Sequence, residues 1–349
     1  MKPRSPADEV SGFQKVGAPP HTPSLRARAF AKSTVASRPL MAAVGRGALG
    51  GPLLLTATRP GINSGLSLLS PVPKGTRTSL VREHTTTGQV RGEWVHQRSG
   101  LGVSGVASGV PNPSSGTSIM YYLHGSGYVI CSPRTHRGLV SRLTRRSGIG
   151  TFSLDYRLGP EYRWPAGGDD AIRGYRWLLS RGFDPKQIIV AGDSAGGHLA
   201  LDLLAANHRD GVGQPAAMAL FSPLYDPSFQ MARKLESRGV RDPIIDVSGA
   251  QKMLGLYTGN ADPNDPRMRV VLTADMDLPP TLIQVGDREV MADDARAIHG
   301  RILDAGGRSQ LQEWPGQGHV FQMFPYFTPE SHRAVSSAGD FIARYSRIH

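Results

Sequence analysis

The chain has 349 residues, of which 39% are hydrophobic and 19% charged, and it carries 40 lysines and arginines against 28 acidic residues. This composition is typical of a folded globular protein and excludes general disorder, collagen-like repeats and a coiled coil, and the length fits one large domain or two smaller ones. The single cysteine, Cys131, excludes an intrachain disulfide framework and most cysteine-based metal sites.

Neither a membrane span nor a secretory signal is expected. Near the N-terminus the longest uncharged hydrophobic stretch is residues 47–58, which glycine and proline interrupt. It is shorter than the roughly 18 apolar residues that indicate a span. The first residues are basic but lack the apolar core of a signal peptide. The sequence therefore predicts a cytoplasmic protein.

The N-terminal quarter has weak patterning. Residues 1–24 are rich in proline, glycine and charge, which predicts a mobile tail. Residues 25–69 have a weak helical period that proline interrupts, so short broken helices are expected there. The interruptions fall at Pro39, Pro52 and Pro60. Residues 85–97 place apolar side chains among threonines and charges, which predicts a strand at the edge of a sheet.

Beyond residue 117, short apolar runs alternate with amphipathic segments. This alternation predicts an α/β protein with a mostly parallel central sheet flanked by helices. The predicted core strands are residues 118–123, 150–155, 187–191, 216–221 and 281–285, with a further strand at 309–314. The predicted helices are residues 169–181, 195–207, 247–257 and 293–305, with another near the C-terminus around Phe341.

The strongest motif is Gly-Asp-Ser-Ala-Gly-Gly at residues 192–197, between an apolar strand and an Ala/Leu-rich helix. Glycines that flank a sharp strand-to-helix turn leave room for a serine at the carboxyl end of the strand. The helix N-terminus supplies free N–H groups for a developing oxyanion. This context predicts that Ser194 is a nucleophile.

A serine nucleophile needs a base, and His319 is the best placed histidine. It follows the strand-like residues 309–314 in a Gly-Gln-Gly-His loop, whereas His299 and His332 lie in helical segments. The order serine, acid, histidine is the one expected for a nucleophile elbow of this kind.

Four acidic residues follow the strand at 281–285, where the third member is expected. Asp293 and Asp294 are interpreted as N-cap and first-turn residues of the next helix. Asp287 and Glu289 remain as alternatives for orienting His319 and stabilising its imidazolium.

The loop His-Gly-Ser-Gly-Tyr at residues 124–128 directly follows the first core strand. Backbone N–H groups can reach a substrate oxygen where side chains are absent, so the loop is a candidate oxyanion hole. The third glycine of a dinucleotide fingerprint is missing, and so is the Gly-Lys-Ser/Thr of a phosphate loop.

These loops together resemble the hormone-sensitive-lipase-like family of α/β-hydrolase fold esterases and lipases. The family has a His-Gly-Gly-Gly type loop and a Gly-Asp-Ser-Ala-Gly elbow. It also has an Asp-Tyr-Arg-Leu-Ala-Pro-Glu segment, which here reads Asp-Tyr-Arg-Leu-Gly-Pro-Glu at residues 155–161. The resemblance covers about residues 80–345, and Ser126 departs from it by replacing a glycine.

The resemblance implies roles for individual residues. The nucleophile falls on Ser194, the base on His319, and the acid on Glu289, the first member of an acid-x-x-x-Asp pattern that continues to Asp293. The oxyanion hole falls on the loop and elbow, and a substrate contact falls on the residue after the loop. These positions are Gly125, Ser126, Gly127 and Ala195 for the oxyanion hole and Tyr128 for the substrate.

The same resemblance implies a serine carboxylesterase that hydrolyses short- to medium-chain esters of small molecules and needs no metal or organic cofactor. Residues 25–75 would form the N-terminal segment of a helical cap, and residues 76–349 the catalytic domain, with 226–260 contributing to the cap. The alternatives are a ligand-binding protein on this scaffold, and a lipase or deacetylase with a longer or N-acetyl substrate. A homodimer is implied only by the family's habit of pairing edge strands.

The net charge of +12 is concentrated at one end of the chain. The first 100 residues hold 14 lysines and arginines and 4 acidic residues, a net of +10, which leaves +2 for the other 249. Two interpretations stay open: a peripheral contact with an anionic membrane, and a solvated basic tail. No aromatic-plus-basic module indicates nucleic-acid binding.

Overall fold

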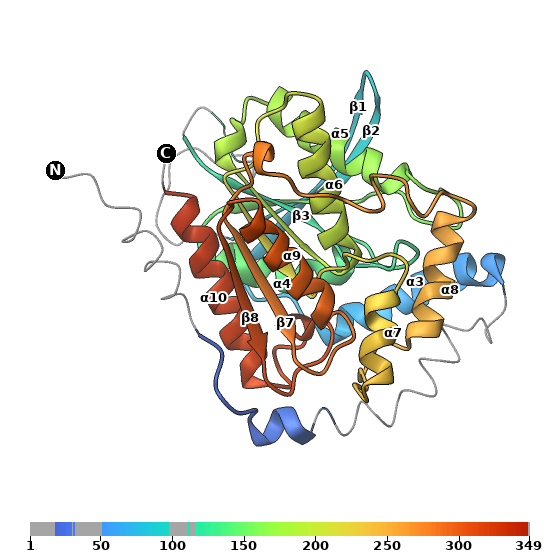
Figure 1. Ribbon diagram of the computed structural model, residues 1–349. Helices are drawn as coiled ribbons and strands as arrows, with labels where there is room; N and C mark the ends of the chain where they lie inside the picture. The colour runs from blue at the N-terminus through green and yellow to red at the C-terminus, as the bar shows by residue number, and fades with distance from the viewer. Residues whose placement is uncertain are drawn as a thin grey trace.

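The computed structural model describes residues 18–29, 31, 51–97, 111, 113 and 116–347. In this part of the chain an eight-stranded sheet has the order β1-β2-β4-β3-β5-β6-β7-β8 (Figure 1). Strands β3 to β8 run parallel to one another, and β2 of the antiparallel hairpin β1–β2 pairs with β4 in antiparallel fashion. The strands are β1 (Thr76–Thr85), β2 (Gly88–Gln97), β3 (Ile119–Leu123), β4 (Gly150–Leu154), β5 (Ile188–Asp193), β6 (Ala217–Phe221), β7 (Thr281–Gly286) and β8 (Ser309–Trp314).

Helices cover both faces of the sheet, each over its own hydrophobic core. Leu139 of α4 and Phe341 of α10 pack on one face together with Tyr122 of β3. On the other face α5, α6 and α9 bury residues such as Leu199 and Ile298 against Tyr121. The helices are α3 (Pro52–Leu69), α4 (Pro133–Ser147), α5 (Ala166–Ser180), α6 (Ala195–Arg209), α7 (Gln230–Ser237), α8 (Val247–Thr258), α9 (Ala292–Asp304) and α10 (Pro329–Tyr345). Within the described residues, the 3-10 helices are η2 (Pro185–Gln187), η3 (Ala274–Met276) and η4 (Phe321–Met323).

The predicted fold class is confirmed, because the parallel strands and their covering helices lie where the alternating pattern indicated. Each core strand begins and ends within two residues of its predicted bounds. The buried strands are continuous apolar runs because helices cover them on both sides.

The strand predicted within residues 85–97 is present as β2, but its predicted edge position was wrong, because β2 pairs with both β1 and β4. The edge strand at this side of the sheet is β1, which was not predicted. Only Val81 of β1 is buried, and Leu80 is 84% exposed, so the strand has no apolar alternation to detect. An edge strand with one solvated face needs few apolar residues.

Two helices were also missed. Helix α4 is rich in arginine, and its apolar residues are too few to stand out, although Ser132 and Pro133 mark its start. Helix α7 is short and charged.

The expected break at Pro60 does not occur, because α3 continues through it to Leu69. The neighbouring Arg59 donates to both carboxylate oxygens of Glu161 and to the carbonyl oxygen of Gly159. This anchoring to the body offsets the hydrogen bond that the proline removes.

Part of the basic N-terminal region lies outside the described residues, including 1–17 of the predicted tail and 32–50 of the predicted cap segment. At the end of that predicted tail, Ser24 donates its backbone N–H and its hydroxyl to the two carboxylate oxygens of Glu330 on α10. The helical residues 25–29 follow directly.

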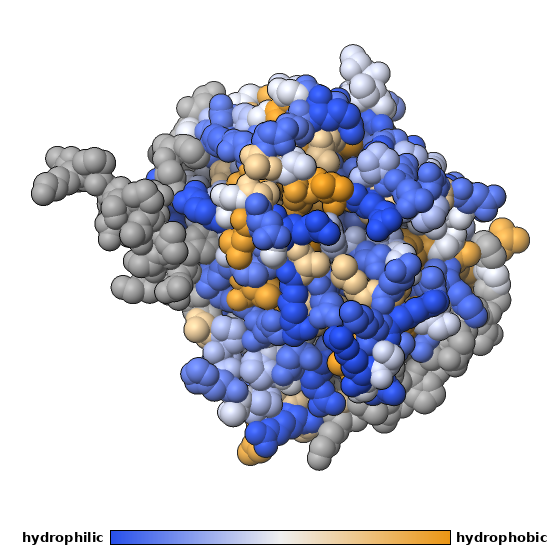
Figure 2. All heavy atoms as spheres, in the orientation of Figure 1, coloured by the Kyte–Doolittle hydropathy of each residue, from blue (hydrophilic) through white to orange (hydrophobic). Residues whose placement is uncertain are grey.

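Large apolar side chains on the surface are scattered over the view in Figure 2 as separate patches among hydrophilic residues. Helix α3 exposes Leu53 and Leu68 almost completely. None of the helices in the described ranges combines the length and the hydropathy that a membrane crossing requires.

Candidate active site

Ser194 lies at a sharp turn between β5 and α6, with φ 51° and ψ −119°. A non-glycine residue in this backbone region is strained, and the surrounding chain must hold it there. Its N–H donates to the carbonyl oxygen of Phe221, and its own carbonyl oxygen accepts from Leu224 N at 3.0 Å. The hydroxyl is thereby held at the carboxyl end of the sheet.

The glycines of the motif are required by close backbone contacts. A β-carbon at Gly196 would lie 1.9 Å from the carbonyl oxygen of Leu123, and one at Gly192 would lie 2.7 Å from the carbonyl oxygen of Gly196. Any side chain at either position would push α6 away from β3 and β5.

His319 is within hydrogen-bond distance of both proposed partners. Its Nε2 is 2.9 Å from Ser194 Oγ, and its Nδ1 is 2.7 Å from Glu289 Oε2. Because the carboxylate accepts the Nδ1 proton, the neutral imidazole has Nε2 free to accept the serine proton. Of the two acids left open by the residue pattern, the structure brings Glu289 to the histidine.

Asp287 lies elsewhere and accepts from the N–H of Gly316 at 2.7 Å. The other two acids are in the first turn of α9, whose N-cap is Met291. Asp293 pairs with Arg296. Asp294 is buried and accepts from the backbone N–H groups of Tyr225 and Asp226. The predicted first-turn placement of these two acids is confirmed, but the predicted N-cap role was wrong because Met291 is the N-cap.

Glu289 is fully buried, and its second carboxylate oxygen is also occupied. Oε1 accepts from the hydroxyl of Ser222 at 2.7 Å and from the N–H of Gly286 at 2.6 Å. The Ser222 hydroxyl accepts in turn from the N–H of Val320, the residue after His319. Ser222 thus connects the acid to the histidine loop. The residue pattern gave Ser222 no role, although it is a polar residue directly after the buried strand β6.

Charge and burial act in opposite directions on His319. Burial by itself would lower its pKa, but the hydrogen bond and negative charge of Glu289 raise the pKa above the ordinary value of 6.5. Asp242 and Asp193 add to this increase. The site therefore favours the imidazolium that forms when the histidine takes a proton.

Asp193, the residue before the nucleophile, is a buried support for the oxyanion loop. It accepts from the N–H of Gly125 at 2.9 Å, from Tyr122 Oη and from His136 Nε2. Burial would raise its pKa, but the partners, His136 foremost, keep the pKa below its usual value. The Gly125 N–H is therefore committed to Asp193, and a β-carbon at Gly125 would lie 2.1 Å from that carboxylate.

Three other predicted donors remain unoccupied. Among the described residues, no acceptor lies within hydrogen-bond range of the N–H groups of Ser126, Gly127 and Ala195. The left-handed conformation in this loop falls on Gly127 (φ 51°) and Tyr128 (φ 63°), and not on Ser126. The serine that replaces a family glycine therefore fits without backbone strain.

The Ser126 hydroxyl turns into the protein and completes a directed chain of hydrogen bonds. It accepts from Tyr128 N at 2.7 Å and lies 2.6 Å from Tyr156 Oη, which donates to the carbonyl oxygen of His124. Since the tyrosine proton is used on His124, the serine donates to the tyrosine. These hydrogen bonds connect the two ends of the loop, His124 and Tyr128, through Ser126 and Tyr156, and they fix the N–H groups of the loop.

Tyr128, predicted to contact substrate, is buried behind the loop. Its hydroxyl donates to His198 Nδ1 at 2.7 Å, and its ring stacks on Tyr257 of α8 at a centroid distance of 4.5 Å. Its contact with substrate stays a prediction.

Helices α3, α7 and α8 lie on one side of the molecule in Figure 1. Met253 of α8 reaches within 3.7 Å of the β-carbon position of Gly127, over the oxyanion loop. Asn63 of α3 accepts from the N–H of Cys131 just beyond that loop. Residues from both segments predicted to form a cap therefore lie beside the candidate site.

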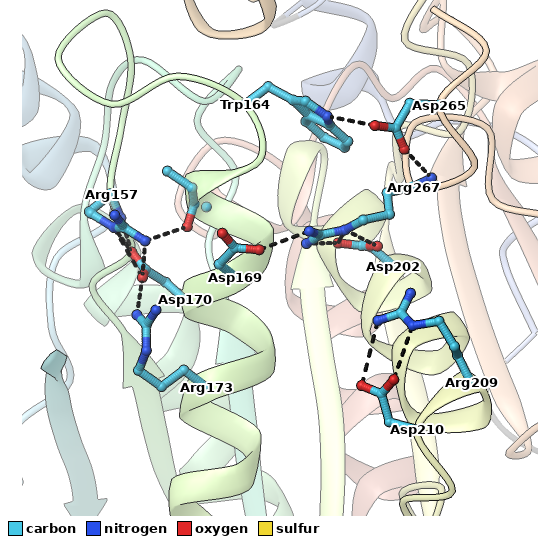
Figure 3. Close-up of polar contacts among 12 residues, drawn as sticks. Arg157, Trp164, Asp169, Asp170, Arg173, Asp202, Arg209, Asp210, Asp265 and Arg267 are labelled. Carbon is cyan, nitrogen blue, oxygen red and sulfur yellow. Dashed lines mark hydrogen bonds and ion pairs between the residues drawn. The ribbon is translucent and has the colours of Figure 1, made fainter. Parts of the chain in front are cut away.

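Arg267 and its acidic partners fix the segment that follows α8. Arg267 points between the two helices α5 and α6 and donates to Asp169 and Asp202 (Figure 3). Asp265 accepts from Trp164 Nε1 (Figure 3). Met268, the residue after Arg267, accepts from His198 Nε2 through its carbonyl oxygen. These contacts connect the end of α8 to the helix that begins at the nucleophile.

Within the described ranges, no three histidine, cysteine or acidic side chains are grouped as metal ligands.

Known proteins resemble this chain in sequence and fold. A family model described as an alpha/beta hydrolase fold matches residues 120–323. An acetyl-hydrolase of Streptomyces hygroscopicus is 35% identical over 257 residues, which are 74% of this chain and 81% of the relative. The carboxylesterase/phospholipase LipF of Mycobacterium tuberculosis is 32% identical over 68% of this chain and 64% of its own length. The crystal structure of an esterase from the bacterial hormone-sensitive lipase family superposes with a TM-score of 0.72 at 31% identity, covering 90% of this chain and 97% of that one.

Proposed function

The chain belongs to the α/β-hydrolase family, in its hormone-sensitive-lipase-like branch, and is a carboxylic ester hydrolase; we propose that it cleaves short- to medium-chain acyl esters of small molecules through a covalent acyl-enzyme. One observation carries the proposal. The hydroxyl of Ser194, the imidazole of His319 and the carboxylate of Glu289 form a continuous chain with heavy-atom distances of 2.9 and 2.7 Å. A nucleophile, a base and an orienting acid in hydrogen-bond contact are the machinery of acyl transfer.

In the proposed mechanism, His319 Nε2 takes the proton of Ser194 while the serine oxygen attacks the ester carbonyl. Glu289 holds the imidazole in the required tautomer and stabilises the imidazolium. The imidazolium then protonates the departing alcohol, which leaves an acyl-serine. Water attacks that ester with His319 again as the base, and the acid and free enzyme are released.

The oxyanion is assigned to the N–H groups of Ser126, Gly127 and Ala195. They are unoccupied by protein acceptors among the described residues, and the last of them is at the N-terminus of α6. Donors that are already oriented stabilise the tetrahedral intermediate without reorganising during the reaction. Side chains and backbone groups of this chain perform every step of the route.

The proposed acyl length has support from the relatives. The Streptomyces relative is named an acetyl-hydrolase, which favours a short acyl group. Met253 above the loop also limits the space next to the oxyanion donors. The mycobacterial relative is named a carboxylesterase/phospholipase, so a preference for long acyl chains is the competing outcome.

The test of the nucleophile is labelling with an organophosphonate that carries a fluorescent tag. We expect one adduct on the wild-type chain, mapped by peptide mass spectrometry to Ser194, and none on Ser194→Ala. Absence of the adduct from folded wild-type protein would contradict the esterase mechanism and favour a ligand-binding protein on this scaffold.

The test of the substrate class is a series of p-nitrophenyl esters from acetyl to palmitoyl. We expect kcat/KM to be highest between acetyl and hexanoyl and to fall for longer chains. A maximum at dodecanoyl or beyond would reject the proposed acyl range and leave the acyl-enzyme mechanism intact.

A further inference from the structure

Another buried carboxylate, Asp242, lies behind the proposed acid and base. It belongs to the loop between α7 and α8, and its exposed fraction is 0%. Its segment is one of those predicted to contribute to the cap, and the residue pattern assigned it no role. An ionisable side chain that is completely buried needs either partners or a function.

All the hydrogen bonds of Asp242 are to backbone N–H groups. One oxygen accepts from Ile244 and Ile245 at 2.8 and 2.9 Å, which shapes its own loop. The other oxygen accepts from the N–H of Val290 at 3.0 Å. Val290 directly follows Glu289, so this bond attaches the α7–α8 loop to the loop of the proposed acid.

The same loop also touches the histidine loop. A β-carbon at Gly318, the residue before His319, would lie 2.5 Å from Pro243 Cγ. Asp242 and Pro243 are adjacent, so a two-residue segment between α7 and α8 contacts one neighbour of the proposed acid and one neighbour of the proposed base.

Asp242 forms none of the ion pairs found among the described residues. The guanidinium of the adjacent Arg241 is directed to the carbonyl oxygens of Glu236 and Val240. Asp242 interacts electrostatically with the proposed base and acid instead. Burial raises the pKa of Asp242 to about 6. The charge of His319 opposes this increase in pKa, and the charge of Glu289 adds to it. His319 and Glu289, on the loops after β8 and β7, are the titratable groups that act on it.

Resting on the proposed function, we propose that Asp242 is a positioning residue for the reaction, which fixes the loops of Glu289 and His319 and adds negative charge that stabilises the His319 imidazolium. The charge has a measurable consequence. Because the negative charge raises the pKa of His319, a neutral residue at position 242 lowers that pKa. The base must be neutral to act, so the acidic limb of kcat/KM moves to lower pH.

The experiment compares Asp242→Asn with a control in the same loop, Asp246→Asn. Asp246 also caps backbone, since it accepts from the N–H of Gly249 at the start of α8, but it has no part in the contacts around His319. We measure kcat and KM for p-nitrophenyl butyrate from pH 5 to 9. The midpoint of the acidic limb is expected to fall by roughly 0.5 to 1 pH unit in Asp242→Asn and to be unchanged in Asp246→Asn.

At pH 8, kcat of Asp242→Asn is expected to fall by about tenfold with little change in KM. The amide has a single acceptor oxygen, so it cannot accept both from Ile244 and Ile245 and from Val290. If Asp242→Asn does not fold, Asp242→Ser provides a second neutral variant that keeps one acceptor. If kcat/KM fell by the same factor at every pH and the midpoint of the acidic limb stayed at its wild-type value, Asp242 would be a purely structural residue and the proposal would be overturned.

Failure of this proposal is distinguishable from failure of the proposed function. Full turnover by Ser194→Ala would reject the serine mechanism itself. An inactive Ser194→Ala together with an unshifted Asp242→Asn profile would reject only the role of Asp242.

Discussion

The two halves of the candidate site are held by different kinds of contact. The nucleophile and the oxyanion loop depend on close backbone packing, since Gly125, Gly192 and Gly196 each lack room for a β-carbon. The acid and the histidine depend on buried side chains from other loops. Ser222 contacts both Glu289 and the histidine loop, whereas Asp242 contacts the loop of Glu289 and the adjacent Pro243 contacts the histidine loop.

This difference matters for what substitutions can do. In the backbone-packed half, adding a single methyl group displaces a helix or a loop. In the side-chain-held half, removing a hydroxyl or a charge leaves the chain path intact and changes the orientation or pKa of the reacting groups. Damage to the first half should therefore appear in stability, and damage to the second half in kcat.

The largest expected effect is at the point where the halves meet. Ser194→Ala removes the nucleophile and is expected to lower kcat by about 10⁶-fold, leaving the residual catalysis of binding and oxyanion stabilisation. Hydrolysis of p-nitrophenyl acetate measures it, with thermal unfolding as the control for folding. Near-normal turnover would contradict the proposed mechanism.

In the acid–base half, Glu289→Gln is expected to lower kcat by about 10⁴-fold, because the amide favours the wrong imidazole tautomer. Asp287→Asn is the matched control. It lies on the same loop and contacts Gly316 N instead of the histidine, so its kcat should stay within about twofold of wild type. The reverse order of the two losses would move the acid role to Asp287.

In the backbone-packed half, Gly196→Ala is expected to reduce the free energy of unfolding by about 3 kcal/mol, because the new β-carbon collides with a backbone oxygen that cannot move away alone. Gly300→Ala is the control: it is also in a helix, and nothing lies within 4 Å of its β-carbon position. Denaturant unfolding should show the control at or above wild-type stability. Equal stability of both variants would refute the packing argument.

Ser222→Ala tests the acid–base half by removing a single hydroxyl group. Loss of the hydroxyl removes one hydrogen bond to Glu289 and one from Val320 N, so kcat is expected to fall by about 10- to 100-fold. KM and the unfolding midpoint should change little. A loss of stability without a loss of kcat would show that Ser222 supports the fold and not the acid.

The smallest effect is expected at Ser126→Ala. The three oxyanion N–H groups are kept, but Tyr128 N and Tyr156 Oη lose their partner, so kcat should fall by less than about tenfold. Substitution to glycine, the residue usual in the family, adds backbone freedom to the same loss. A larger loss in the glycine variant than in the alanine variant would show that backbone freedom limits the loop.

Much of the arrangement could be read from the residues. The elbow at 192–197 and the glycine-rich loop each stand at the end of an apolar run, and the histidine loop follows the more polar strand at 309–314. The structure brings Ser194 and His319 together as predicted. Of the missed elements, β1 and α7 have polar sequences in which burial is confined to one or two positions. Such elements form because neighbouring elements offer a surface or a hydrogen-bonding edge, which no local period reveals.

The sequence by itself determined which residues are chemically able to act and which turns require glycine, because these depend on side-chain type and on local backbone geometry. Tertiary structure decided which acid meets His319, and it recruited Ser222 and Asp242 to hold that acid. Those contacts join loops that are 48 to 98 residues apart in the chain. The strand order of the sheet and the path between α7 and α8 bring the loops together, and neither is encoded in the pattern of any single segment.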